Sequence, residues 1–244
     1  MAKVFSDGLT ETRIYLDEAV QTDWLDTEVK IAYNRAYHDV CAFVMEVYEQ
    51  FYETLTPFTY AISANVQEYP IDSSLIKVTR VEINYNPTTT GSQPNRCEPI
   101  KMDEIRGNLG NTNNAGSFFS AGYYLHGAIG VQQIGFIPIP TTSDTTGKSI
   151  SVWGIALPTD LVLSTDNVNI PYADRFSYLV ALRAAAQLLR KGQQEEAAAA
   201  RYLQEYRAGC QDLMTFIKGR QSDDGEYIQD NVLEDIDFSV LEII

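Results

Sequence analysis

Residues 24–53 form the longest periodic run of the chain and set what the rest must supply. Apolar side chains recur there at spacings of three and four, which places them on one face of an α-helix. They are Val29, Ala32, Tyr33, Ala36, Tyr37, Val40, Phe43, Val44, Val47, Tyr48 and Phe51. Pro57 ends the pattern, because proline cannot continue a helix. At about 1.5 Å per residue the predicted helix is about 45 Å long, so it requires long partners.

Residues 171–218 are the part of the chain that can supply these partners. Two amphipathic stripes lie on either side of Gly192, and each has the helical period. The sequence predicts that they form an antiparallel hairpin against which residues 24–53 pack, since all three apolar stripes would otherwise face water. A shorter helix is predicted at 8–20, with Ile14, Leu16 and Val20 available for burial. The expected result is a bundle of three to four long helices.

Residues 57–170 have a different texture, in which apolar and polar residues alternate as in half-buried strands. Strands are expected at 58–71, 74–86, 122–140 and 149–158, with a bulge near Arg80. Gly, Asn, Ser and Thr dominate residues 87–121, which predicts exposed loops with a short helix at 102–109. The predicted fold class is α+β, with a small antiparallel β-domain inserted between helices. The predicted parts are 1–56, 57–170, 171–218 and an extended C-terminal tail, 219–244.

The tail alternates acidic with large apolar residues. A segment that stays solvated does not normally carry so many apolar side chains, so the tail is expected to dock on a partner. The docking residues that the pattern selects are Tyr227, Ile236, Phe238, Leu241, Ile243 and Ile244.

The formal net charge is −15, from 33 acidic and 18 basic residues. A chain this acidic repels a phosphate backbone, which argues against reading a DNA sequence. We found no signal peptide and no apolar run long enough to span a membrane, and the three cysteines suggest no disulfide framework. These features favour a soluble protein made in the cytosol.

Catalytic and metal-binding patterns are missing from the sequence. His38 and His126 have no second histidine at metal-ligand spacing, and no base is placed beside a nucleophilic Ser or Cys. The acidic residues around Asp223 do not follow the order of a calcium loop. We therefore expect no enzyme activity, no cofactor and no metal.

The order of these parts resembles the head-to-tail adaptor proteins of tailed double-stranded DNA bacteriophages. The resemblance covers nearly the whole chain. Its most specific pieces are N-R-A-Y at Asn34–Tyr37 and A-x-x-Y-L-x-E-Y at Ala199–Tyr206. Neither is a catalytic signature.

The resemblance implies a virion neck protein that forms a ring, typically of twelve copies, between the portal and a tail or nozzle protein. Such a ring continues the DNA channel, and its C-terminal segment engages the portal. An acidic wall suits this role, because DNA passes it without sticking. On this interpretation Asp39, Glu46, Glu49 and Glu53 face a neighbouring subunit or the channel, and reversing their charge should disturb assembly or DNA passage rather than folding.

Two alternatives stay open from the sequence. The first is another phage neck or tail-completion protein. The second, from a different class, is a glycan-binding or glycan-hydrolysing module on the β-domain that uses Trp153, Tyr123 and Tyr124 as stacking platforms. Tyr123 and Tyr124 are adjacent, so one of the two is expected to face outward from a strand.

Overall fold

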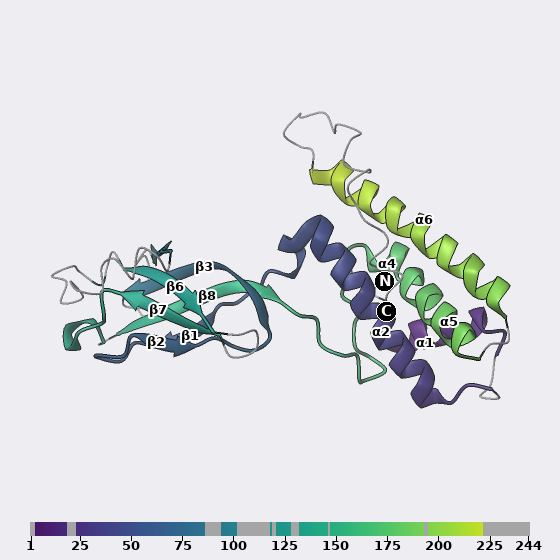
Figure 1. Ribbon diagram of the computed structural model, residues 1–244, viewed down its shortest axis with the longest axis horizontal. Helices are drawn as coiled ribbons and strands as arrows, with labels where there is room; N and C mark the ends of the chain where they lie inside the picture. The colour runs from purple at the N-terminus through teal and green to yellow at the C-terminus, as the bar shows by residue number, and fades with distance from the viewer. Residues whose placement is uncertain are drawn as a thin grey trace. The chain divides into compact units, whose positions relative to one another are not determined.

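The computed structural model describes residues 3–18, 23–85, 94–101, 118, 121–127, 132–145, 147–192 and 195–221. It divides into two compact units, which we treat separately (Figure 1). Met1–Tyr48 and Asp160–Ile244 belong to the helical unit, and Glu49–Thr159 form the β unit. The chain is therefore of mixed α+β class, as the sequence predicts.

The first helix, α1, spans Phe5–Tyr15 and starts earlier than the predicted 8–20. Its buried stripe is Phe5, Gly8 and Thr12, whereas Ile14 is 70% exposed. The expectation that Ile14 is buried was wrong, because Ile14 lies outside the stripe of Phe5, Gly8 and Thr12 that is buried. Gly8 is required at this contact, since a Cβ there would overlap the buried ring of Tyr33.

Helix α2 spans Asp26–Tyr48 and has the buried face that the periodicity predicts, from Val29 to Val44. It does not run on to Glu53 as one α-helix. Glu49–Tyr52 form a 3-10 turn, so α2 itself is about 35 Å long rather than 45 Å. The tighter turn belongs to the β unit, where Tyr52 is buried.

Three further helices complete the helical unit: α4 (Ala173–Phe176), α5 (Tyr178–Gly192) and α6 (Glu196–Gln221). Helix α5 contacts α1, α2 and α6. Helices α5 and α6 are antiparallel, because Phe176, just before α5, contacts Phe216 near the end of α6, while Arg183 within α5 lies over Tyr206, earlier in α6. Gly209 permits this approach, since a Cβ there would lie 2.7 Å from Tyr178 Oη.

The described residues of the β unit form two four-stranded sheets. One has the order β1-β8-β3-β4, from Phe58–Ala61, Lys148–Ala156, Leu75–Tyr85 and Asn95–Arg96. The other has the order β2-β7-β6-β5, from Glu68–Pro70, Gln133–Ile137, Gly122–His126 and Glu98–Pro99. Both sheets contribute to one buried cluster that includes Val81, Val152, Tyr123 and Phe136, so the core lies between them.

Two details of these sheets bear on the sequence predictions. The register of β3 against β8 shifts between Val78 and Arg80, which confirms the bulge expected near Arg80. The sheets are not wholly antiparallel, however, because β5 pairs with β6 in parallel. Parallel neighbours need a long connection, and the residues between Pro99 and Gly122 supply it. The expected 102–109 helix falls outside the described residues.

None of the helices in the described part of the chain combines the length and the apolar composition needed to cross a bilayer.

Candidate interaction surface

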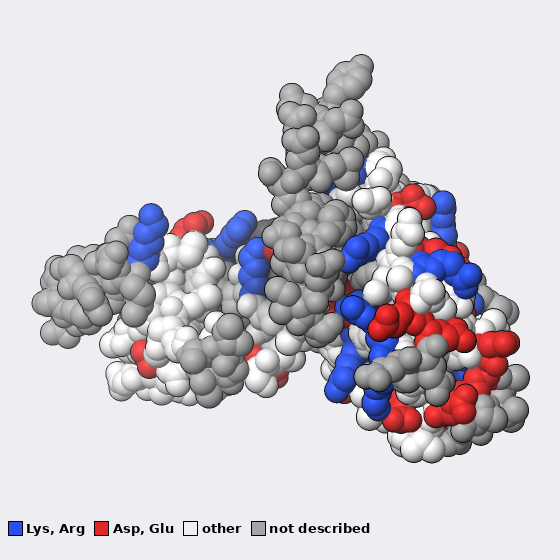
Figure 2. All heavy atoms as spheres, turned by 45° about the vertical axis from the view of Figure 1, so that its right-hand side comes forward, with Lys and Arg blue, Asp and Glu red and all other residues white. Residues whose placement is uncertain are grey.

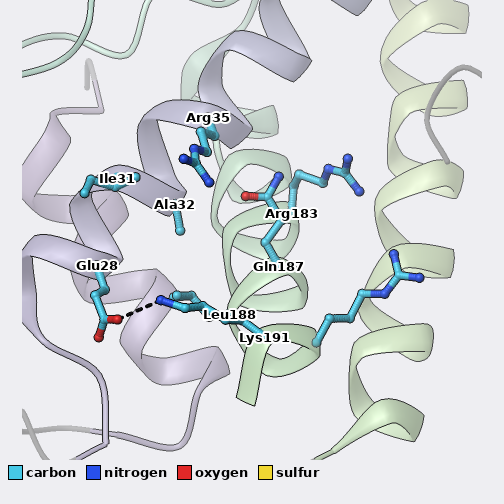
Figure 3. A pocket seen from close by; sticks show the side chains of 9 residues that line it. Glu28, Ile31, Ala32, Arg35, Arg183, Gln187, Leu188 and Lys191 are labelled. Carbon is cyan, nitrogen blue, oxygen red and sulfur yellow. Dashed lines mark hydrogen bonds and ion pairs between the residues drawn. The ribbon is translucent and has the colours of Figure 1, made fainter. Parts of the chain in front are cut away.

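The helical unit has a groove between α2 and α5 with a volume of about 590 Å³. Helix α2 contributes one wall and the C-terminal half of α5 the other (Figure 3). The lining residues are Glu28, Ile31, Ala32, Arg35, Arg183, Gln187, Leu188, Arg190 and Lys191. Four of the nine are cationic and one is anionic, in a chain whose overall charge is strongly negative. The groove is therefore a locally basic site.

One end of the groove is closed by an ion pair. Lys191 Nζ lies 2.8 Å from Glu28 Oε1, and Figure 3 shows the two side chains reaching across from α5 and α2. This hydrogen bond, with a second from the backbone N–H of Leu25, holds the pKa of the Glu28 carboxyl below its usual value. Glu28 is accordingly ionised at neutral pH and offsets one of the four cations.

A second ion pair lies behind the groove wall. Arg183 Nε donates to Asp39 Oδ2 over 2.9 Å, and the two side chains are only 4% and 15% exposed. Gln187 Nε2 donates to the same oxygen over 3.4 Å. Because burial strengthens such a pair and makes a lone charge costly, this contact fixes α2 against α5. Arg183 is thus a structural member of the lining.

Arg35 and Arg190 are the two remaining cations, and both are exposed. Neither forms an ion pair or hydrogen bond with another residue in the described ranges. Beside them, Ile31 is 54% exposed, an unusual exposure for so large an apolar side chain on this helix. The groove therefore presents two unneutralised guanidinium groups and one apolar contact, a combination that suits an anionic segment with apolar side chains.

The four acidic residues predicted to face a subunit or the channel have different surroundings. Asp39 is bonded to Arg183, so its side chain is already used within the chain. Glu46 is exposed on α2. Glu49 accepts from Lys77 at 2.7 Å, and Glu53 accepts from Thr79 at 2.7 Å, both inside the β unit. For Asp39 we therefore no longer expect charge reversal to spare folding.

The docking residues predicted in the tail, from Tyr227 to Ile244, lie outside the described residues.

The histidines and cysteines are placed as structural residues. His38 Nε2 lies 2.7 Å from Asp160 Oδ1, and His126 Nε2 lies 3.2 Å from Glu68 Oε1. Burial raises the pKa of the Cys97 and Cys210 thiols to about 12, so neither forms a thiolate nucleophile at neutral pH. Across the described ranges there is no cluster of three or more potential metal-ligating side chains.

The aromatic residues proposed as glycan platforms are placed as follows. Tyr123 and Tyr124 are 8% and 7% exposed, so neither presents an open ring to solvent. Tyr123 belongs to the core between the sheets, while Tyr124 covers Gly135, where the missing side chain leaves room for its ring. Trp153 is half-buried under the Arg80 guanidinium, 4.3 Å from the ring centroid. No open aromatic platform is formed by these three residues.

The groove residues were not predicted from the sequence. Arg35 and Arg190 are 155 positions apart, and only the packing of α2 on α5 brings their helices together. One signal was available: residues 171–218 are the only section in which basic residues outnumber acidic ones. That local excess could have indicated a basic surface on the hairpin.

The described residues thus form a helical unit with a basic groove and a β unit with an apolar core, in a chain of net charge −15. A comparison with protein-family models matches residues 5–229 to the family described as SU10 adaptor protein. This match spans most of the chain, so the protein belongs to the SU10 adaptor protein family, a family of structural phage adaptors rather than enzymes. No curated protein matches the chain.

Proposed function

We propose that the protein is a head-to-tail adaptor that forms a ring between the portal and the tail of a phage particle and continues the DNA channel. The observation that carries the proposal is the family match over residues 5–229. Twelve copies are the expected number, and a tail or nozzle protein is the expected partner on the far side. The site of action is the virion neck, after assembly in the host cytoplasm.

The helical unit supports this proposal by its surfaces. A closed ring needs heterologous contacts, in which one face of a subunit meets a different face of the next. Helices α1, α2 and α6 each contact α5, and the helical unit exposes apolar side chains at Ile14, Leu25 and Ile31. Exposed apolar residues on such a rigid body are suitable contacts for a neighbouring subunit.

The charge distribution supports passage of DNA through such a ring. The net charge is −15, so twelve copies would carry a large negative charge. Unpaired carboxylates on the channel side would repel the DNA backbone and prevent specific binding. Glu46, which is exposed on α2, is our candidate for this role or for a subunit contact.

The tail, residues 219–244, is proposed to dock on the portal through its apolar residues. Mixing the full chain with its portal and measuring the masses of the complexes by mass photometry should give one portal ring carrying one adaptor ring. Deletion of 227–244 should weaken this complex while leaving the circular dichroism signal of the helices intact. An adaptor that never forms a ring with the portal would contradict the proposal.

A further inference from the structure

We propose that the basic groove between α2 and α5 holds residues 232–238 of the chain's own acidic tail before the tail meets a partner. The inference does not depend on ring formation, since it concerns the isolated chain. It assigns an occupant to a described surface where two cations without partners lie beside an exposed apolar side chain.

Charge complementarity is the first argument. Residues 222–244 contain eight acidic residues and no lysine or arginine. The groove presents Arg35 and Arg190 without partners in the described part of the chain, with Lys191 beside them. A guanidinium group forms charge-assisted hydrogen bonds with carboxylates, preferably in pairs. The tail is therefore the best-matched segment within the chain itself.

The mixed character of the tail is the second argument. In VLEDIDF, residues 232–238, large apolar side chains alternate with acids. A groove that bound the tail by charge alone would need only the acidic residues of the tail. The groove offers both chemistries, because Ile31 is 54% exposed and lies one helical turn from Arg35. Ile236 or Phe238 can cover Ile31 while Asp235 and Asp237 reach the guanidinium groups.

The tail is long enough to reach the groove, which is the third argument. The C-terminal half of α6 packs at the N-terminal end of α5, where Phe216 contacts Tyr172 and Phe176. The length of helix from Phe176 to Arg190 and the length from Phe216 to Gln221 add up to about 30 Å, at the usual rise per residue. The 14 steps from Gln221 to Asp235 extend to about 45 Å. The tail is therefore long enough to reach the groove of its own chain, and tethering raises its effective concentration there.

The test is amide hydrogen exchange of the full chain in the absence of portal, read on tail fragments by mass spectrometry. Residues 232–238 should exchange about tenfold more slowly than an unstructured segment, the protection that two exposed ion pairs support. Arg35→Glu/Arg190→Glu should abolish this protection. The matched control is Lys30→Glu/Arg201→Glu, which makes the same charge change at two other exposed cations on α2 and α6 and should leave protection unchanged.

A charge exchange makes the test specific. Adding Asp235→Lys/Asp237→Lys to the Arg35→Glu/Arg190→Glu chain should restore protection, because the ion pairs re-form with opposite sign. Equal exchange in the native chain, the groove variant and the control would overturn the proposal. Protection that falls on dilution would also overturn it, because the groove would then belong to a second copy. Either result leaves the ring proposal standing, since ring formation on the portal is measured separately.

Discussion

The helical unit carries an ion pair through its packed interior, whereas the core between the two sheets of the β unit is apolar. In the first, Asp39 and Arg183 join α2 to α5. In the second, the buried cluster between the sheets contains no charged residue among those described. The ion pairs lie outside this cluster: Lys77 with Glu49 is solvent-exposed, whereas the side chains of Lys148 and Asp144 are 15% and 13% exposed. Figure 2 shows the same contrast outside, with charged side chains dense on the visible face of the helical unit and sparse on that of the β unit.

This difference indicates how the two units are used. Burying a charge is costly unless it is paired, so the packing of α2 on α5 depends on this ion pair in addition to the apolar core of the helical unit. The β unit depends on general apolar burial, which tolerates surface change. We therefore expect recognition by charge to be concentrated on the helical unit, where the groove lies.

The largest loss of stability is expected from truncating a large side chain in the core of the β unit. Phe136 is fully buried, with its ring 6.0 Å from that of Tyr69 and 5.9 Å from that of Phe118. Phe136→Ala should lower the free energy of unfolding of the β unit by about 3–5 kcal/mol. Urea unfolding followed by hydrogen exchange of the strand amides measures this. Ile76→Ala, at a site 39% exposed, is the control and should cost less than about 1 kcal/mol.

The second-largest loss of stability is expected from removing one partner of the buried Asp39–Arg183 ion pair. Asp39→Ala should destabilise the helical unit by about 3 kcal/mol, because it leaves the Arg183 guanidinium buried and unpaired. Circular dichroism at increasing urea measures this loss. Glu46→Ala on the same helix is the control, with a change within about 0.5 kcal/mol. Adding Arg183→Met to Asp39→Ala should recover stability; equal effects of Asp39→Ala and Glu46→Ala would contradict the role given to the pair.

The exposed ion pair of Glu49 with Lys77 in the β unit should contribute little to stability. A double-mutant cycle of Glu49→Ala and Lys77→Ala should give a coupling below about 1 kcal/mol, because both side chains are solvated. The coupling should shrink further in high salt. A coupling as large as that of Asp39 with Arg183 would remove the contrast between the two units.

The smallest effect is expected at Glu11 in α1. Burial raises the pKa of its carboxyl, and its Oε2 atom has no hydrogen-bond partner in the described structure. A raised pKa in the folded state stabilises the fold at low pH, and this contribution is lost as pH rises. Glu11→Gln should therefore raise the melting temperature slightly at pH 7. The gain in the free energy of unfolding should be no more than about 0.5 kcal/mol. Below the ordinary pKa of 4.5 the difference should vanish. A gain that persists at low pH would point to a cause other than charge.

Periodicity predicted the elements whose apolar pattern is strong. The buried face of α2, the two C-terminal helices and the bulge in β3 were all expected from spacing alone. The start of α1 was missed because Phe5 precedes any repeating pattern. The parallel β5 was missed because two residues carry no period.

Apart from the basic excess of residues 171–218, the candidate surface could not be predicted from the sequence, for a different reason. A carboxylate in an acidic chain looks like surface charge, and nothing near Asp39 in the sequence indicates that Arg183 neutralises it. The groove likewise depends on helices far apart in the chain. Long-range pairing of charges is decided by packing, so local spacing cannot predict it.

The central claim, that the protein is a ring-forming adaptor of the phage neck, is tested most directly by electron cryomicroscopy of intact particles. We predict one closed ring of this chain between the portal and the tail, with its helical unit fitting the density and acidic residues facing the channel. Density for the chain elsewhere in the particle, or a neck without it, would contradict the claim.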